Sequence, residues 1–118
     1  MNINFKASVA VLGLLASLPS IAAETFHVAS SIYQNGELVE SPVMIVEADK
    51  KAYMTIGDDF SYELTVSPNA DQTVQVKTAL TVNQVSASPV LTVAYDKQAS
   101  VEVGKTKLTV RVNQYNGS

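Results

Sequence analysis

Apolar and polar residues alternate along most of the chain after residue 23, and this alternation predicts β-strands. One face of each of four segments collects Phe26, Val28, Ser30 and Ile32; Phe60, Tyr62, Leu64 and Val66; Val74, Val76, Thr78, Leu80 and Val82; and Leu108, Val110 and Val112. In this part of the chain no helical period is long enough to predict a helix. We therefore expect an all-β fold of about eight to ten strands.

A stretch of 17 residues occurs twice, 47 positions apart. Residues 41–57 read SPVMIVEADKKAYMTIG and residues 88–104 read SPVLTVAYDKQASVEVG, with eight identical positions, where about one is expected by chance. The chain is thus predicted to be a duplication, with repeat 1 at residues 24–66 and repeat 2 at residues 73–113.

Each copy of this stretch is predicted to be a β-hairpin. A three-residue loop, at 49–51 or 96–98, keeps Met44 and Val46 on the same inward face as Met54, because an odd loop preserves the parity of the two arms. In the same pattern Ala52 and Ile56, and likewise Ala99, Val101 and Val103, face inward.

Several residues predict turns and breaks between these strands. Asn35-Gly36 is suited to a tight two-residue turn, and Asn83-Gln84 in the second copy predicts a looser one. Pro42 is expected at a strand start, an edge or a bulge, since it cannot donate a ladder hydrogen bond. Gly57 and Gly104 are expected to take a positive φ.

Residues 24–118 number 95, which is enough for one core, whereas two cores of about 45 residues would be marginal. The two repeats are therefore expected to share a core. Pattern and size favour an antiparallel β-sandwich in which the sheet of one repeat faces the sheet of the other. A small closed β-barrel is the alternative.

Residues 1–23 are expected to be a secretory signal peptide rather than part of the domain. Lys6 precedes an apolar run from Ala7 to Leu18, and small residues follow it, with cleavage expected after Ala23 or Ala22. The run is shorter than the roughly 20 residues of a membrane span. We expect a periplasmic or secreted protein without a membrane span.

Charge and cysteine content narrow the classes of function. Lys6 is the one charged residue of the leader, so residues 24–118 hold seven Lys and Arg against 11 Asp and Glu, a net charge of −4. An acidic domain argues against a nucleic-acid partner. The chain has no cysteine, so its stability is expected to come from burial and not from disulfides.

The repeated pattern of Ser-Pro, alternating apolar residues, Asp-Lys, Ala, further alternation and Gly resembles a hairpin in the core domain of bacterial secretins, the outer-membrane rings of secretion and type IV pilus systems. The resemblance covers residues 41–57 and 88–104. Secretins commonly have a proline shortly after the glycine, where this chain has residues 58–60 and 105–107. With no room for their ring-building domains, we do not expect this chain to be a secretin. The resemblance implies a role near an envelope assembly.

The sequence offers no set of residues for catalysis, metal binding or cofactor binding. His27 is the only histidine and is expected to be an outward strand residue, so neither a Cys/His pair nor a zinc site can be assembled. Asp58 and Asp59 lack the spacing of a calcium loop and are expected in a turn. Met44 and Met54 are expected in the core.

Tyrosines are the remaining candidates for recognition, and the two singled out are Tyr53 and Tyr33. Tyr53 is predicted on the outer face of the hairpin, opposite Glu47, and Ser100 replaces it in the second copy. We expect a non-enzymatic envelope protein that acts through protein–protein contacts, by a sheet edge and as an accessory to an envelope or secretion assembly. The alternative is a module that binds carbohydrate or another small ligand between the sheets.

Overall fold

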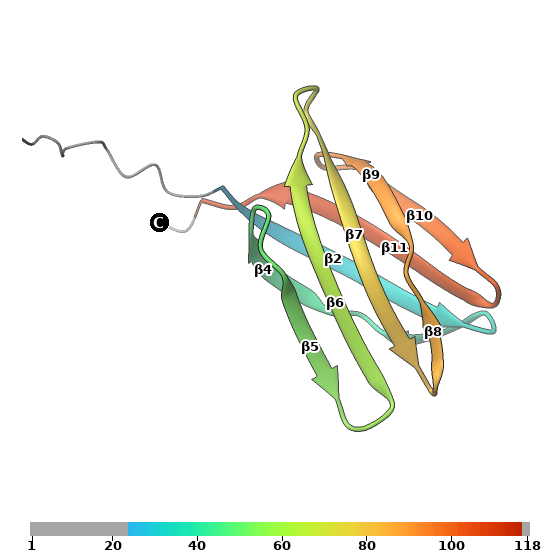
Figure 1. Cartoon of the computed structure of the whole chain (residues 1–118). Helices are drawn as coiled ribbons and strands as arrows, with labels where there is room; N and C mark the ends of the chain where they lie inside the picture. The colour runs from blue at the N-terminus through green and yellow to red at the C-terminus, as the bar shows by residue number, and fades with distance from the viewer. Residues whose placement is uncertain (1–23, 117–118) are drawn as a thin grey trace, which may run out of the picture.

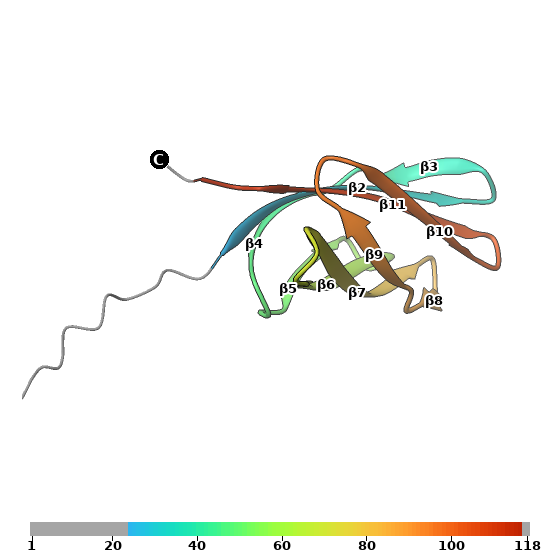
Figure 2. The same cartoon turned by 90° about the horizontal axis from the view of Figure 1, so that it is seen from above.

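A computed structural model describes residues 24–116, which form ten β-strands in two antiparallel sheets. The strands are β2 (Thr25–Gln34), β3 (Glu37–Glu40), β4 (Val43–Glu47), β5 (Ala52–Ile56), β6 (Phe60–Pro68), β7 (Thr73–Val82), β8 (Val85–Ala87), β9 (Val90–Ala94), β10 (Gln98–Val103) and β11 (Thr106–Gln114). The sheets face each other as a β-sandwich and do not close into a barrel, which confirms the predicted fold class (Figures 1 and 2). The predicted signal peptide lies outside the described residues.

The two sheets have the same strand order. In the first, here called the β2 sheet, the order is β10, β11, β2, and both β3 and β4 pair with the far side of β2. In the second, the β7 sheet, the order is β5, β6, β7, and both β8 and β9 pair with the far side of β7. Each strand of the first half of the chain thus has an equivalent five strands later.

The repeats exchange strands, so each sheet combines three strands of one repeat with two of the other. Nine residue pairs join β6 to β7, and nine join β11 to β2. The expectation that the sheet of one repeat faces the sheet of the other is therefore wrong. The two repeats do share one core.

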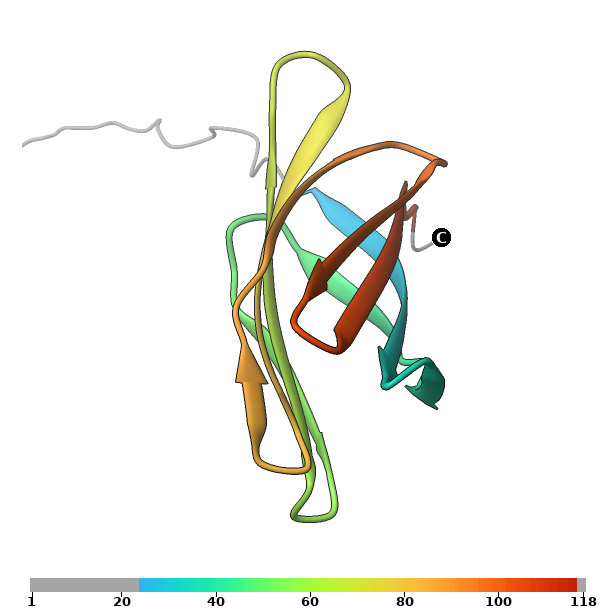
Figure 3. The same cartoon turned by 90° about the vertical axis from the view of Figure 1, so that its right-hand side faces the viewer.

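The predicted hairpin is also wrong, because its two arms lie in different sheets. β4 pairs with β2, and β5 pairs with β6. Residues 48–51 cross from one sheet to the other as a β-arch (Figure 3), and residues 95–97 do the same between β9 and β10. The alternation of apolar and polar residues fits a hairpin and an arch equally well, since the two arms of an arch also turn their apolar rows toward one core. Longer strands, β2 and β6, provide the pairing partners instead.

Backbone hydrogen bonds attach each arch to the strands beside it. The N–H of Ala48 donates to the carbonyl oxygen of Glu24 at 2.8 Å, and that of Asp49 to Val66 at 2.8 Å. In the second arch the N–H of Asp96 donates to Val112 at 3.1 Å. Asp49 and Asp96 have φ values of 62° and 64°. Aspartate tolerates this left-handed conformation better than most residues, which accounts for its presence in both copies.

Proline interrupts the outermost strand of each sheet, as predicted for Pro42. β3 and β4 follow each other along β2, and the break between them falls at residues 41–42. The carbonyl oxygen of Pro42 accepts a hydrogen bond from Ser30 N–H at 3.0 Å, and that of Pro89 accepts one from Thr78 N–H at 3.1 Å. The ladder therefore continues across each break through the proline carbonyl.

The turns agree with the predictions except at one position. Asn35 and Gly36 form a two-residue turn with φ values of 54° and 83°. Asn83 and Gln84, predicted to be looser, form the same two-residue turn with φ values of 48° and 71°. Asparagine and glutamine here adopt the left-handed backbone that the tight turn requires. Gly57 and Gly104 have positive φ as predicted.

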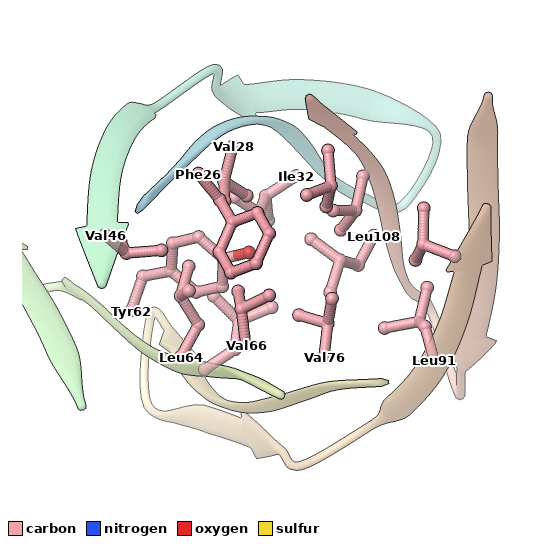
Figure 4. Packing of buried hydrophobic residues seen from close by; sticks show 14 of the residues in the cluster. Phe26, Val28, Ile32, Val46, Tyr62, Leu64, Val66, Val76, Leu91 and Leu108 are labelled. Atoms are coloured by element: carbon pink, nitrogen blue, oxygen red, sulfur yellow. The ribbon is translucent and has the colours of Figure 1, made fainter. Parts of the chain in front are cut away.

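Seventeen hydrophobic side chains, each at most 6% exposed, fill the space between the sheets. Figure 4 shows most of them. They include every apolar residue of the four predicted inward faces, which are thus confirmed, together with Val46, Leu91 and Val93. Met44 and Met54 are half-buried against this core. Ile56 and Val103 are 42% and 44% exposed, because they lie at the ends of their strands. Each still lies on the predicted inward face, since Ile56 pairs with buried Phe60 and Val103 with buried Thr106, but the core does not cover it.

Candidate interaction surface

The strand order leaves two groups of edge strands, one on each side of the sandwich: β3, β4 and β5 on one side and β8, β9 and β10 on the other. β4 and β5, joined by the arch at 48–51, form what is here called the β4–β5 side. β9 and β10, joined by the arch at 95–97, form the β9–β10 side. An edge strand carries backbone N–H and C=O groups that lack a strand partner. These two sides are therefore the places where another chain can add a strand.

The β4–β5 side presents large apolar residues on two edge strands. Val43 and Ile45 alternate with the inward residues of β4 and are 59% and 49% exposed. Tyr53, at the middle of the outer face of β5, is 62% exposed. Neither residues 43–46 nor residues 52–56 include a charge. Charged residues are a common protection of edge strands against pairing; β5 has none, and β4 has only Glu47, at its end.

The β9–β10 side is more polar at two of the three equivalent positions; at the third, Val90 is 54% exposed, much like Val43. Thr92 stands where β4 has Ile45, and Ser100 stands where β5 has Tyr53. β10 also includes Glu102 within the strand. The repeat therefore offers an internal comparison, in which the same backbone position is apolar on one side of the molecule and polar on the other.

The two tyrosines singled out from the sequence lie on opposite outer faces. Tyr53 belongs to the β7 sheet, where its strand partner is Glu63 and not the predicted Glu47. Tyr33 belongs to the β2 sheet, and the Nζ atom of Lys107 lies 5.7 Å from the centroid of its ring. The structure thus does not bring Tyr33 and Tyr53 together. Tyr53 joins the β4–β5 side, whereas Tyr33 pairs with a lysine of the neighbouring strand.

Val43 and Ile45 were not singled out from the sequence. A signal was nevertheless present, because Ile45 and Thr92 occupy the same position of the two repeats. The difference between Ile45 and Thr92 indicated that Ile45 faces outward. It did not indicate that its strand lies at the edge of a sheet, because that depends on the order of the strands.

No protein-family model matches this chain, and neither curated proteins nor solved structures give a significant match.

His27, Asp58 and Asp59, the polar residues considered for metal binding or catalysis, lie apart from one another on the surface of the sheets and in a turn. His27 lies on β2, opposite Ile45 and Asn113, on the outer face of its sheet, as predicted. Asp58 and Asp59 are exposed in the turn between β5 and β6. Among residues 24–116, no group of three or more His, Asp and Glu side chains is placed to hold a metal ion. In the same range, no helix has the length and apolar composition to cross a bilayer.

Two tyrosines have a pKa above the ordinary value because of burial. In the core, burial raises the pKa of Tyr62 to about 12, against a smaller opposing effect of its hydrogen bond to Ser30. At the second arch, burial and then the charge of Glu24 raise the pKa of Tyr95, whose ring stacks on Phe26 with centroids 6.2 Å apart. Both tyrosines pack within the fold, and neither contributes to the β4–β5 side.

Proposed function

We propose that this chain is a non-enzymatic exported envelope protein that acts through protein–protein contacts at the β4–β5 side. The observation that carries the proposal is the pair of edge strands β4 and β5, with exposed Val43, Ile45 and Tyr53 and with Glu47 as their one charged residue. An extended segment of a partner can add to such an edge, where backbone hydrogen bonds supply affinity and alternate side chains supply specificity. Large apolar side chains then bury surface that water otherwise covers.

Export is part of the proposal and is supported by the sequence of residues 1–23, with a basic start, an apolar run and small residues after it. We place the protein in the periplasm or outside the cell. The likeness in sequence of residues 41–57 and 88–104 to a segment of secretins supports an accessory role near an envelope or secretion assembly.

Binding of carbohydrate or another small ligand between the sheets is the alternative considered from the sequence. Phe26, Tyr62 and Leu108 are among the side chains that occupy that space (Figure 4). A ligand there would have to displace these packed side chains, because a close-packed interior leaves few voids larger than a water molecule. The packing therefore favours the surface over the interior as the place of binding.

Affinity capture from an envelope extract tests the proposal when two matched variants are compared. Ile45→Asp adds a charge to the outer face of β4, and Thr92→Asp adds one at the equivalent position of β9. We expect a protein partner that the wild type and Thr92→Asp retain and Ile45→Asp loses, with unchanged circular dichroism for all three. Equal capture by both variants would place the contact elsewhere. Intact mass of the envelope protein tests the removal of residues 1–22 or 1–23.

A further inference from the structure

Acidic and basic residues are divided unequally between the two repeats. Repeat 1, residues 24–66, holds eight Asp and Glu against two Lys, a net charge of −6. Repeat 2, residues 73–113, holds five Lys and Arg against two Asp and Glu, a net charge of +3. The chain is therefore acidic as a whole because a strongly acidic repeat 1 outweighs a basic repeat 2.

The fold turns this division into an acidic half and a basic half of the molecule. In both sheets the strands of repeat 1, β2–β6, lie toward one edge, and those of repeat 2, β7–β11, lie toward the other. Figure 4 shows Val46 of β4 and Leu91 of β9 at opposite sides of the core. The β4–β5 side thus belongs to the acidic half, and the β9–β10 side belongs to the basic half.

The acidic residues of repeat 1 are accessible, and most of them have no basic neighbour. None of the eight is buried: Glu24, Glu37, Glu40, Glu47, Asp49, Asp58, Asp59 and Glu63. Lys50 and Lys51, the two basic residues of this repeat, pair with Glu47 and Glu63 at 3.3 Å and 3.6 Å. Within residues 24–66 the other six acidic side chains form no ion pair.

The basic residues of repeat 2 are accessible as well. All five are exposed, on β7, in the second arch, in the turn before β11 and on β11: Lys77, Lys97, Lys105, Lys107 and Arg111. Asp96 and Glu102 are the acidic residues of this repeat, so the half keeps an excess of positive charge. Opposite charges of this kind attract over distances of about 10 Å at moderate salt.

Strand direction allows the two sides of different copies to pair. Across the β2 sheet, β10, β11, β2 and β4 are successively antiparallel, so the edge strands β10 and β4 run in opposite directions. In the β7 sheet the same holds for β5 and β9. When a second copy sets its β9–β10 side against the β4–β5 side, its β10 lies antiparallel to β4 and its β9 antiparallel to β5. Both sheets then continue through one contact.

Half-buried apolar side chains at both sides of the core would be covered by this contact. Met44, Ala52 and Met54 pack against the core at the β4–β5 side, and Ala99 and Val101 do so at the β9–β10 side. Continuation of both sheets places the inward residues of the next copy beside them. Burial of apolar surface therefore adds to the attraction between the charges.

The charges also distinguish this contact from a symmetric dimer. A two-fold dimer brings the same side of both copies together, so two acidic halves or two basic halves would meet. Head-to-tail contact instead brings an acidic half to a basic half, and complementary potentials favour it. Because each copy keeps one free side of each kind, the contact can repeat.

We infer that copies of this chain associate head to tail, with the β4–β5 side of one against the β9–β10 side of the next, into an open filament with two continuous sheets. The inference rests on the proposed function in that it assigns an occupant to the β4–β5 side. The occupant is the basic half of another copy of the same chain.

Two variants that each block one side test the inference by sedimentation velocity. Met54→Lys and Val101→Lys stand at equivalent positions of the repeats. In a single molecule the new lysine can extend to water from its edge strand, whereas a neighbouring copy would enclose it. We expect the wild type to form oligomers longer than dimers at about 20 mM salt, and each variant alone to stay monomeric. An equal mixture of the two should form a one-to-one dimer, because each variant keeps the side that the other lacks.

Two double variants at exposed positions test the role of charge. Lys107→Glu/Arg111→Glu reverses the sign of the basic half and should raise the Kd between copies by at least about tenfold. Lys50→Glu/Lys51→Glu makes the same change of charge in the acidic half and should leave the Kd equal or lower it. Salt at about 500 mM should weaken the wild-type oligomers. Circular dichroism checks that each variant is folded, and the charge variants decide if a lysine variant is not.

A wild-type protein that stays monomeric up to about 1 mM at low salt would overturn the inference. Self-association of Val101→Lys would also overturn it, because two β4–β5 sides would then have met. Equal weakening by the two charge variants would do the same, since it would show general repulsion. A monomer that still captures another protein in an Ile45-dependent manner contradicts the filament and leaves the proposed function intact. Head-to-tail oligomers without Ile45-dependent capture do the reverse.

Discussion

The hydroxyl of Tyr62 lies 2.9 Å from Oγ of Ser30, and this hydrogen bond joins the two sheets inside the core. Ser30 belongs to β2 and Tyr62 to β6, and they are 5% and 0% exposed. A buried hydroxyl without a partner costs about 1–3 kcal/mol. Each of these two residues therefore supplies what the other needs in order to be buried.

Replacing one partner should destabilise the protein more than the lost bond alone. We expect Ser30→Ala to lower the free energy of unfolding by about 1–3 kcal/mol, because it leaves the hydroxyl of Tyr62 without this partner. Ser30→Ala combined with Tyr62→Phe should cost less than the sum of the single changes. Urea denaturation of the three variants at neutral pH measures the coupling. Strict additivity would show that the bond contributes nothing.

The raised pKa of Tyr62 predicts a loss of stability at alkaline pH. Between pH 10 and about 12 the unfolded chain releases the phenolic proton while the folded protein retains it. Unfolding is therefore favoured as pH rises through this window, by about 3 kcal/mol for a shift from 10.0 to about 12. Tyr62→Phe should show a smaller decline than the wild type in urea midpoints measured from pH 9 to 12. Parallel declines would contradict the assignment.

Alternation along β9 predicts opposite effects for two neighbouring residues. Val93 is 1% exposed, and Val93→Asp would bury a carboxylate in the core, at a cost of several kcal/mol, about the whole stability of a small domain. Thr92 is exposed on the outer face, and Thr92→Asp should change stability by less than about 0.5 kcal/mol. Thermal melts of the two variants compare them. An unfolded Thr92→Asp beside a stable Val93→Asp would invert the face assignment.

The direction in which each residue faces could be predicted from the sequence, whereas the partners of most strands could not. Phe26, Val28 and Ile32 must share a face in any strand because side chains alternate, whatever strand lies beside them. An arch and an odd-length hairpin satisfy the same alternation at residues 41–57. Only the competition among strands for pairing partners decides between them, and the partners of β4 in β2 are 14 to 22 positions away in the sequence.

For the candidate surface too, the exposed residues could be predicted from the sequence, whereas the position of their strands in the sheet could not. The difference between Tyr53 and Ser100 was visible in the aligned repeats, and it indicated a surface present in one copy only. That β4 and β5 are edges depends on the exchange of strands between repeats, which no local pattern records. That Ile45 lies on an edge strand is therefore known only from the strand order.

The left-handed backbone of the two arches predicts an unusual order of substitutions at Asp96. With φ at 64°, Asp96→Gly should be tolerated, since glycine adopts this region without strain. Asp96→Val should cost about 1–2 kcal/mol, because a β-branched residue is strained there. Asp49, with φ at 62°, should behave in the same way. Urea denaturation of the Gly and Val variants checks the order, and a Val variant as stable as the Gly variant would refute it.

Because the repeats exchange strands, we expect that the loop joining them can be cut if the two ends of the chain are linked instead. Tyr115 N–H donates to the carbonyl oxygen of Thr25 at 2.9 Å, so the described ends of the chain lie side by side. Their counterpart in the repeat is the loop at residues 69–72, which joins β6 to β7. A permuted chain that links residue 116 to residue 24 and opens between Ala70 and Asp71 should fold to the same two sheets, because all strand pairs remain.

Cutting the same loop without joining the ends should have a different result. Residues 24–68 and 69–118, expressed alone, each hold strands of both sheets but not the partner strands of the nine-residue pairings. Each half should be unfolded or associate with itself, since it would otherwise expose one apolar face of every strand. Mixed in equal amounts, the halves should form a one-to-one complex with the circular dichroism of the intact chain. Two folded monomeric halves in sedimentation experiments would contradict the exchange of strands.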